Sequence, residues 1–430
     1  MTPEQALAAF AAGCLVPPAH VRSAAERLLG DTLKVGSAGA ASKEALALSR
    51  IAAPGPCRLL AGGTASVGDA AFANGFAIHC LEWDPVHEEA VVHACSVITA
   101  ALLALADERP GHSRDQLIEA FVVGVEVAAG LGLAATGPMR FFRPATAGVV
   151  GAALAGGRLR GLDEAQCGQL IGLAVSFAGG TMQAHLEGSI ALPLQIAAAA
   201  RSAVSAVSCV EAGLAGPAEA LGGQFGYAAL IEPLDFERWL PGLGSRWLTS
   251  EVSLKPWPCG RASHALLSAI GVMDIDASEL QSLTAYVPPL VHRLVGRPLR
   301  ADMPPPYARL CGPYLAAMMF DEGRIDPRRF VFGSAPEPAL VALAERITFD
   351  LDANADFNAL GPQRFLFEDD SGITDLRIEH AIGSPHSPMS AALAKDRDEL
   401  LGQVAGADVS GAGGAALMQD PLAWAMGEDG

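Results

Sequence analysis

Residues 113–135 read SRDQLIEAFVVGVEVAAGLGLAA, and this stretch decides the fold class. Ser113 and Gln116 are spaced as a capping box, a pair of residues that starts a helix by satisfying each other's free backbone amides. Apolar residues then occupy nearly every face of the helix, which indicates burial on several sides rather than along one stripe. The stretch therefore predicts a helix in the interior of a helical domain.

The same pattern recurs on both sides of this helix. Thr2 and Gln5 form another capping box, and Asp163 is a third N-cap. We expect helices over residues 3–13, 18–32, 67–83, 93–107, 114–134, 146–159, 164–182 and 192–212. Frequent Ala and Gly residues let helix axes approach closely. Residues 1–263 are thus predicted to form a large, all-helical domain.

The sequence changes character after about residue 264. A helix over 265–273 precedes an apolar run at 280–290, and a cap at 334–337 starts a helix that reaches residue 346. Strand-like segments follow at 347–351, 364–368 and 373–382, and the alternation in the last one predicts a hairpin. We expect a smaller α+β lid domain over residues 264–388, inserted before a C-terminal helical segment, residues 389–430, that rejoins the helical domain. The predicted fold class is mainly α.

Length and charge limit the function classes. The chain has 430 residues, more than the roughly 250 to 300 that one hydrophobic core supports. Hydrophobic residues make up 51% and charged residues 18%, which predicts a folded protein. The net charge is 29 − 47 = −18, and such a surface repels phosphate backbones and anionic lipids. Nucleic acid and membranes are therefore not expected partners.

Cysteine spacing and hydropathy predict a cytoplasmic protein. The eight cysteines include no C-x-x-C pair, so they are interpreted as reduced core thiols. The N-terminus lacks a basic stretch followed by an apolar run, which gives no sign of a signal peptide. The longest apolar stretch, residues 121–135, is shorter than the roughly 20 residues of a membrane span.

Residues 74–101, NGFAIHCLEWDPVHEEAVVHACSVITAA, concentrate ionisable groups between two apolar helices. These groups are His79, Glu82, Asp84, His87, Glu88, Glu89 and His93. Pro85 disfavours helical geometry at Asp84, so the first helix should end near Trp83. His93 should begin the next helix, where its charged form is disfavoured.

Carboxylates beside a neutral imidazole suit proton abstraction next to a carboxylate or carbonyl group, because one group can take a proton and another can return it. Two other interpretations remain open. The cluster is also typical of a solvated acidic loop with a capping histidine. Its residues are hard ligands as well, so a metal site is a third possibility, although the HExxH spacing is missing.

A second constellation is LKPWPCGRASH, residues 254–264. Prolines on both sides of Trp257 stiffen the backbone, which would suit Lys255 and Arg261 to bind a carboxylate. The alternative is a proline-stiffened crossover between domains, with solvated cations and His264 capping the next helix. Cys259 is interpreted as a packing residue, since no base lies near it in sequence.

Four motifs together resemble the MmgE/PrpD family. They are NGFAIHCLEWD at 74–84, GVVGAALAGGRLRGLD at 148–163, KPWPCGRASH at 255–264 and GSPHSPMS at 383–390. The family includes 2-methylcitrate dehydratases, cis-aconitate decarboxylases and iminodisuccinate epimerases. The resemblance implies a homodimer without cofactor or metal, in which a large helical domain carries a smaller lid.

The resemblance also implies site residues. Glu82, Asp84 and His93 would share acid–base duty, and Lys255 and Tyr314 would stabilise the carboxylate or enolate. Arg143 or Arg261 would orient the substrate, with His264 nearby. Four positions depart from the family pattern: Leu192 and Gln195 replace a pocket lysine and histidine, Phe142 or Arg143 replaces another histidine, and Gly260 stands where the decarboxylases have one.

These departures remove cationic groups from the predicted pocket. Each desolvated anionic oxygen needs a charged or N–H partner, so a tricarboxylate is disfavoured. If Arg140 and Arg143 point inward, we expect a substrate with one or two carboxylates and an apolar part near Leu192 and Phe142. The predicted function is a lyase or isomerase acting on a small hydroxy or amino acid, above all a dehydratase. An epimerase, or a carboxylate-binding homologue without activity, is the alternative.

Overall fold

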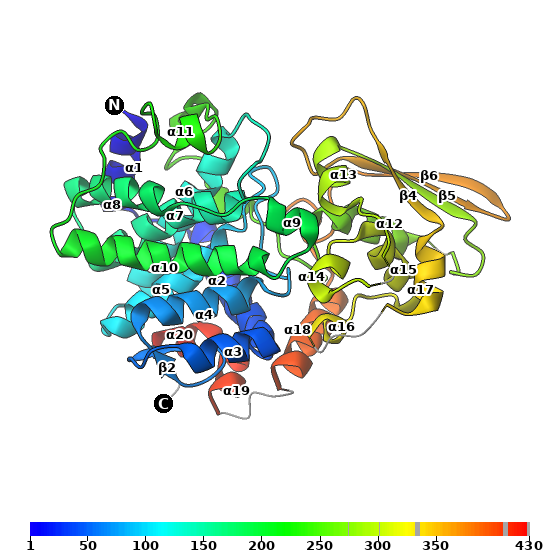
Figure 1. Ribbon diagram of the computed structural model, residues 1–430, viewed down its shortest axis with the longest axis horizontal. Coiled ribbons are helices and arrows are strands. Elements are labelled where there is room, and N and C mark those ends of the chain that lie inside the picture. Colours follow the sequence, from blue (N-terminus) through cyan, green and yellow to red (C-terminus); the bar gives the residue numbers. More distant parts are fainter. Residues whose placement is uncertain (274, 301, 332–335, 407–411, 428–430) are drawn as a thin grey trace.

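The computed structural model describes residues 1–273, 275–300, 302–331, 336–406 and 412–427. Figure 1 shows a large helical lobe beside a smaller lobe that contains a sheet. The helices of the first lobe are α1 (Pro3–Ala12), α2 (Ala19–Ala40), α3 (Lys43–Ile51), α4 (Val67–His79), α5 (Ala94–Glu108), α6 (Arg114–Ala134), α7 (Arg143–Arg160), α8 (Glu164–Phe177), α9 (Gln183–Glu187), α10 (Ala191–Glu211) and α11 (Tyr227–Leu230). Two short strands, β1 (Cys57–Arg58) and β2 (Thr64–Ala65), pair beside them. The predicted fold class, mainly α with a small α+β part, is confirmed.

The three predicted helix starts are confirmed. Thr2, Ser113 and Asp163 each accept a hydrogen bond from the backbone amide three residues later, and each forms a complete capping box. α6 then runs from Arg114 to Ala134 as predicted and packs against α5 and α7. Capping is set by a few neighbouring residues, so it can be recognised in the sequence.

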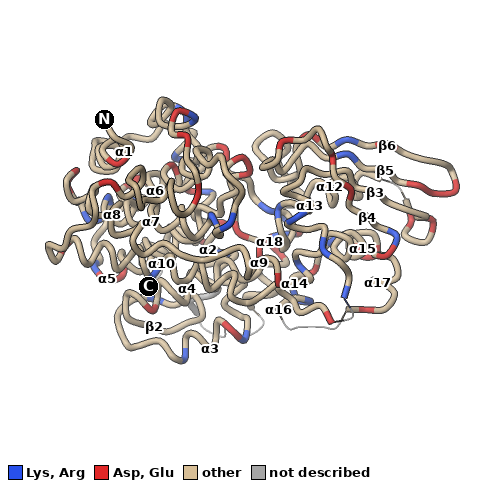
Figure 2. Tube along the Cα trace, turned by 45° about the horizontal axis from the view of Figure 1, so that its top comes forward, with Lys and Arg blue, Asp and Glu red and all other residues tan. Residues whose placement is uncertain are grey.

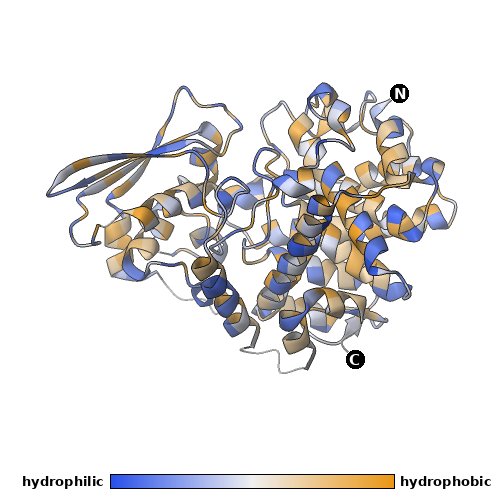
Figure 3. Ribbon diagram, turned by 180° about the vertical axis from the view of Figure 1, so that it is seen from behind, coloured by the Kyte–Doolittle hydropathy of each residue, from blue (hydrophilic) through white to orange (hydrophobic). Residues whose placement is uncertain are grey.

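Within the described residues, two helices are long and apolar enough to cross a membrane, α6 and α10. The sequence-based argument that the apolar stretch is too short therefore does not hold for α6, which has 21 residues. α6 is a core helix, because 94% of the residues in its most apolar window are buried inside the protein. Figure 3 shows how the apolar helices of this lobe pack on one another.

Several helix ends differ from the prediction. α2 continues to Ala40, and α3 was not predicted at all. A Cβ at Gly39 would lie 2.0 Å from the carbonyl oxygen of Ala77, so glycine lets α2 cross directly over the end of α4. α8 stops at Phe177 because Gly179 and Gly180 follow, and α7 starts early, with Pro144 in its first turn.

The second hydrophobic core lies almost entirely within residues 257–381, which we call the α+β unit. Its helices are α12 (His264–Val272), α13 (Pro289–Val295), α14 (Pro305–Ala308), α15 (Gly312–Glu322), α16 (Arg328–Val331) and α17 (Pro338–Ala344). Its strands are β3 (Ser282–Val287), β4 (Ile347–Leu351), β5 (Gln363–Asp369) and β6 (Gly372–Ile378), in the order β4-β3-β5-β6. The predicted cap at Ser334 and Ala335 lies outside the described residues.

The sheet explains which strand predictions succeed. β5 and β6 form the predicted antiparallel hairpin, and β3 pairs parallel with β4. Alternate residues of β3, Leu283, Ala285 and Val287, are buried. β6 ends at Ile378 rather than at residue 382, because its partner strand begins at Gln363 and Pro362 before it has no amide to donate.

In the described chain, three short 3-10 turns lie between the two units: η1 (Phe236–Arg238), η2 (Leu240–Gly242) and η3 (Leu248–Glu251). A further turn, η4 (Arg261–Ser263), lies near the start of the α+β unit. After the sheet, α18 (Ala391–Gly406), α19 (Ala412–Gln419) and α20 (Pro421–Met426) pack against α2. Leu400 and Leu401 of α18 belong to the core of the helical lobe. The C-terminal segment thus lies on the helical lobe, and its first helix, α18, also lies next to the α+β unit (Figure 1). Figure 2 shows acidic and basic residues distributed over both lobes.

Candidate functional site

The loop from 80 to 93, between α4 and α5, carries the ionisable cluster. Glu82 and Val91 adopt left-handed backbone conformations, with φ of 54° and 53°. Such a conformation in a residue other than glycine costs about 1–3 kcal/mol and is found mainly at functional sites. The loop is held by paired backbone hydrogen bonds between Val86 and Ser253 and between His87 and Val92. This pairing places the loop directly beside the segment that contains Lys255.

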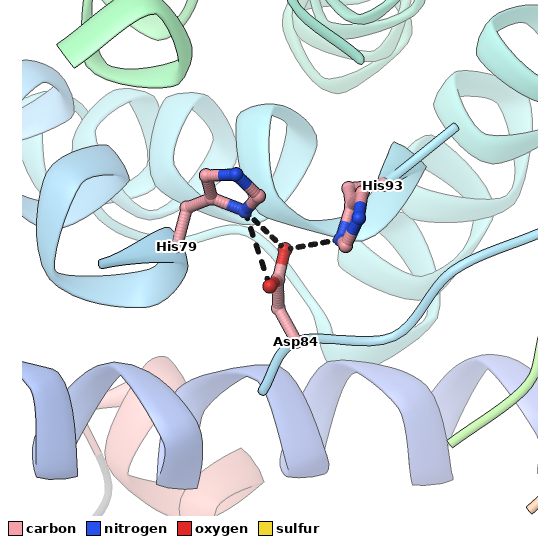
Figure 4. Close-up of side chains that lie close together, drawn as sticks. All are labelled: His79, Asp84 and His93. Atoms are coloured by element: carbon pink, nitrogen blue, oxygen red, sulfur yellow. Dashed lines mark hydrogen bonds and ion pairs between the residues drawn. The ribbon is translucent and has the colours of Figure 1, made fainter. Parts of the chain in front are cut away.

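Two histidines converge on one buried carboxylate (Figure 4). His79 Nδ1 lies 3.0 Å from Asp84 Oδ2, and His93 Nδ1 also lies 3.0 Å from the same oxygen. The hydroxyl of Ser96 donates a further hydrogen bond to it. α4 ends at His79 and His93 caps α5, so the helix ends themselves bring the two rings together.

Glu82 forms the second half of the cluster. Lys255 Nζ donates to the Glu82 carbonyl at 2.7 Å and to its Oε2 at 3.3 Å. His79 Nε2 lies 3.4 Å from Glu82 Oε1, and His93 Nε2 lies 3.9 Å from Glu82 Oε2. Lys255 is fully buried, so this ion pair is shielded from water. Glu82, Asp84, His93 and Lys255 therefore meet, as the sequence predicts.

The two histidines of the cluster have pKa values shifted in opposite directions. Burial would lower the pKa of His79, but Asp84 and Glu82 overcome this effect and raise the pKa to about 9. Burial lowers the pKa of His93 below its ordinary value, with Asp84 opposing and Lys255 adding to the decrease. Burial disfavours the ionised forms of Glu82 and Asp84, yet the nearby cations hold both pKa values well below normal. At neutral pH, His79 is charged and His93 is a neutral base.

A small cavity of about 50 Å³ lies next to this cluster, between the two units. Glu82 and His93 line it from the loop, Phe142 and His185 from the helical lobe, and Arg261 and Leu294 from the α+β unit. Asp84 and His79 lie behind His93, with the His79 and His93 ring centroids 4.8 Å apart. His93 is thus the ring of the pair that faces the cavity.

The backbone of Lys255 is held from two sides. Trp83 Nε1 donates to the Lys255 carbonyl at 3.1 Å, and Arg397 Nε of α18 donates to it at 2.6 Å. Arg397 also pairs with the buried Asp31 of α2. A Cβ at Gly383 would lie 2.1 Å from the Leu254 carbonyl oxygen, so only glycine allows this loop to pack there.

The predicted substrate-binding cations have different roles. Arg143 is buried and donates to Glu232 and to the Ala90 carbonyl, and it lines a separate, wider groove. Arg261 lines the cavity while it pairs with Glu88 at 2.8 Å. His264 is buried, and its ring centroid lies 5.3 Å from that of Trp257. It does not line the cavity. Burial, aided by the charge of Arg261, holds its pKa well below normal.

Like Arg143 and His264, three further predicted residues lie outside the cluster in the described part of the chain. Tyr314 is buried in the core of the α+β unit, where Arg329 and Glu337 are its charged neighbours. Leu192 packs in the helical core, and Gln195 lines another groove and donates to the Thr181 carbonyl at 3.0 Å. The family resemblance gave these positions, but the packing of α10 and α15 directs their side chains elsewhere.

Two site residues were not assigned from the sequence. His79 was noted in the cluster without a role, although it lies one helical turn before Glu82. His185 lines the cavity from α9, and Arg297 Nη2 donates to its Nδ1 at 2.9 Å. No local pattern around His185 indicates this position, because the contact depends on how α9 packs against the α+β unit.

His79, Asp84 and His93 also form a group that could hold a metal ion, with ligand atoms within 4.8 Å of one another. A metal requires deprotonated ligands. His79 would therefore have to lose a proton that the two carboxylates stabilise. The donor atoms suit a divalent ion, but at neutral pH that ion competes with the proton.

The sequence matches two family profiles. The MmgE/PrpD N-terminal domain matches residues 5–237, and the MmgE/PrpD C-terminal domain matches residues 257–398. Cis-aconitate decarboxylase of Homo sapiens is 31% identical over 210 residues, which are 46% of this chain and 43% of that protein. The enzyme of the same name from Mus musculus is 32% identical over 213 residues, or 46% and 42% of the two chains. Cis-aconitate decarboxylase of Aspergillus terreus (strain NIH 2624 / FGSC A1156) is 28% identical over 285 residues, or 59% and 56%. The matched region spans about half the length of these relatives.

Proposed function

Since the chain belongs to the MmgE/PrpD family, we propose that it is a lyase or isomerase that removes a proton from the carbon next to a carboxylate. The observation that carries this proposal is the pairing of Asp84 with His93, whose neutral ring faces a small cavity. Asp84 accepts the hydrogen of His93 Nδ1, which leaves the lone pair of Nε2 free to take a proton.

The neighbouring charges support this step. When His93 takes the substrate proton it becomes a cation, and Asp84 and Glu82 stabilise that cation from 3.0 and 3.9 Å. Lys255 compensates the charge of Glu82, so the carboxylate can remain ionised in a buried place. The same imidazolium can then return its proton, as acid–base catalysis requires.

Dehydration is the favoured outcome. The Cα–H bond breaks and its electron pair forms the Cα=Cβ bond, while the Cβ–O bond breaks. The leaving hydroxide takes the proton from His93 and departs as water. Epimerisation uses the same first step and returns the proton to the other face of Cα.

The cavity is smaller than the roughly 300–1,000 Å³ of usual ligand pockets. Its walls come from both units, so we propose that the two units separate to admit a substrate. The α+β unit therefore acts as the lid that the family resemblance implies.

Deuterium exchange in D₂O tests the proposal directly. We expect deuterium to replace the hydrogen on Cα of hydroxy or amino acids, which NMR measures. We expect His93→Gln to abolish this replacement. His87→Gln is the matched control, because His87 lies in the same loop but its Nε2 faces Glu251 at 3.6 Å. Equal exchange by wild type and His93→Gln, both folded by circular dichroism, would refute the proposal.

A decarboxylase is the second candidate, favoured by the names of the similar proteins. Gly260 argues against it, because a Cβ there would lie 2.7 Å from Leu310 Cδ2, leaving no room for a histidine without repacking. Release of CO₂ from cis-aconitate, measured with carbonic anhydrase and a pH indicator, distinguishes the two candidates.

The family resemblance also leads us to propose a homodimer. Phe177 and Ile190 are exposed large apolar residues, and they lie at the end of α8 and the start of α10. Covering such an apolar surface favours association. Light scattering after gel filtration should give twice the mass of the chain, and Phe177→Asp should weaken the dimer.

A further inference from the structure

We propose that the cavity selects a monocarboxylate with an alkyl part, whose carboxylate is bound by His185 and Arg261, and that it rejects the tricarboxylates named for the relatives. This inference rests on the proposed function, since it concerns the substrate of the same site. It assigns His185 a role in binding and gives the apolar wall of the cavity a role in specificity.

Charge at the cavity wall is balanced. Of the described residues that line the cavity, Glu82 is the carboxylate and Arg261 is the guanidinium, while His93 and His185 are neutral at pH 7. The one positive charge among these residues, that of Arg261, already pairs with Glu88 at 2.8 Å. A substrate with three carboxylates would bring negative charges without partners into a dry site, which is strongly unfavourable.

The other nearby cations are already engaged. Lys255 Nζ bonds twice to Glu82, and Arg143 bonds to Glu232 and to the Ala90 carbonyl. Neither lines the cavity in the described structure. Arg297 lies behind His185, to which two of its hydrogen bonds run. Lys255 and Arg143 cannot serve additional carboxylates without breaking buried pairs. Arg297 Nη1 has no hydrogen-bond partner among the described residues, but Arg297 does not line the cavity.

His185 is fixed as a hydrogen-bond donor. Arginine is always protonated, so the Arg297 N–H donates to His185 Nδ1 and that nitrogen must be the acceptor. The neutral ring therefore carries its hydrogen on Nε2. Burial and the charge of Arg297 lower the pKa of His185 to about 3, so this tautomer persists at all ordinary pH values.

Arg261 supplies the second donor. Its Nη atoms bond to Glu88 and to the carbonyls of Ala381 and Ile382. Its Nε is buried and has no hydrogen-bond partner among the residues that the structure describes. A buried N–H without a partner costs free energy, and a carboxylate oxygen would satisfy it. His185 and Arg261 thus contribute one donor from each unit to the lining of the cavity.

The remaining wall is apolar. Phe142 and Met182 line it from the helical lobe, and Leu294, Val295 and Leu360 line it from the α+β unit. An alkyl group gains free energy by leaving water for such a surface, whereas a second carboxylate loses its hydration there. The lining of the cavity thus combines four polar residues, Glu82, His93, His185 and Arg261, with a larger number of apolar ones.

Met182 offers a direct test, because it lines the cavity yet is only partly buried. Binding of 3-hydroxy monocarboxylates with four to six carbons, of malate and of citrate would be measured by calorimetry, together with deuterium exchange at Cα. Wild type should bind the best monocarboxylate at least about tenfold more tightly than malate or citrate. Met182→Lys should reverse this preference, and Met182→Leu should keep it.

A second variant tests the donor. His185→Leu should weaken monocarboxylate binding by about tenfold, while His185→Gln, which keeps a donor, should restore most of it. Tighter binding of citrate than of any monocarboxylate by wild type, or no binding of monocarboxylates, would overturn the inference. If exchange is seen only with malate or citrate, the inference about the substrate is wrong, while the proposed function stands. If monocarboxylates bind selectively but no exchange occurs, the inference about the ligand holds and the proposed function is wrong.

Discussion

Replacement of His79 tests the electrostatics of the cluster. The pKa of His79 is raised from 6.5 to about 9 by Asp84 and Glu82, against the effect of burial. The difference, 9 − 6.5 = 2.5, corresponds to about 3 kcal/mol at 1.36 kcal/mol for each pKa unit. This stabilisation is complete below the unfolded pKa of about 6.5 and is lost as the pH rises towards 9, because the folded state alone holds the proton in that range.

We therefore expect the free energy of unfolding of the wild type to fall by about 3 kcal/mol between about pH 6.5 and 9. Urea denaturation followed by tryptophan fluorescence at several pH values measures this change. His79→Gln cannot hold the proton, so its stability should be lower but nearly independent of pH over the same range. The difference between the two pH profiles is the quantity to compare.

Comparing the two proteins also removes the contribution of other ionisable groups to the pH dependence of stability. Burial raises the pKa values of the Cys57 and Cys311 thiols to about 11, and such thiols add a fall in stability at alkaline pH to both proteins. That contribution cancels in the difference. If wild type and His79→Gln lose stability in parallel from neutral pH to 9, His79 is not charged in the folded protein, and the assigned charge states of the cluster are wrong.

Four further predictions follow from buried contacts and donor chemistry. Lys255→Met leaves Glu82 without its amine and should reduce exchange at Cα by about a hundredfold, whereas adding Glu82→Gln should recover stability but not exchange. Arg143→Met should lower the free energy of unfolding by about 3–5 kcal/mol in urea titrations, and the double variant with Glu232→Gln should lose clearly less than the single one. Arg397→Met should reduce kcat about tenfold with a smaller change in KM, since it displaces the Lys255 backbone; an unchanged kcat in a folded variant would exclude this positioning role. Treatment with EDTA should leave exchange unchanged, and excess Zn²⁺ should inhibit more strongly at about pH 9 than at pH 6; activity that depends on added metal would contradict the proton-transfer scheme.

Local features of the fold could be predicted from the sequence. The capping boxes at Thr2 and Ser113 define exact helix starts because all their contacts lie within four residues. The continuation of α2 to Ala40 could not be predicted, since Gly36 and Gly39 usually disfavour a helix interior. Here the close crossing of α4 at Gly39 stabilises the helix, and that contact is visible only in three dimensions.

The residues of the candidate site also divide into those that the sequence predicts and those that it does not. Glu82, Asp84 and His93 lie within twelve residues of one another, so their proximity follows from one loop. Lys255 was found through its proline-rich surroundings and the family resemblance. His185 comes near the cavity through packing between units, which leaves no mark in the local sequence. Tyr314 illustrates the opposite case, since a matching position in sequence lies in a different core.

The hydrogen bond from Arg397 to the Lys255 carbonyl has a consequence for biosynthesis. A nascent chain leaves the ribosome from its N-terminus, so α4, α5 and Lys255 emerge well before α18. Until then, of the described donors to that carbonyl, Trp83 is the one already translated. Partly translated chains would therefore fold much of the helical lobe while Lys255 is still poorly aligned, and the contacts around Glu82 would be completed late in translation.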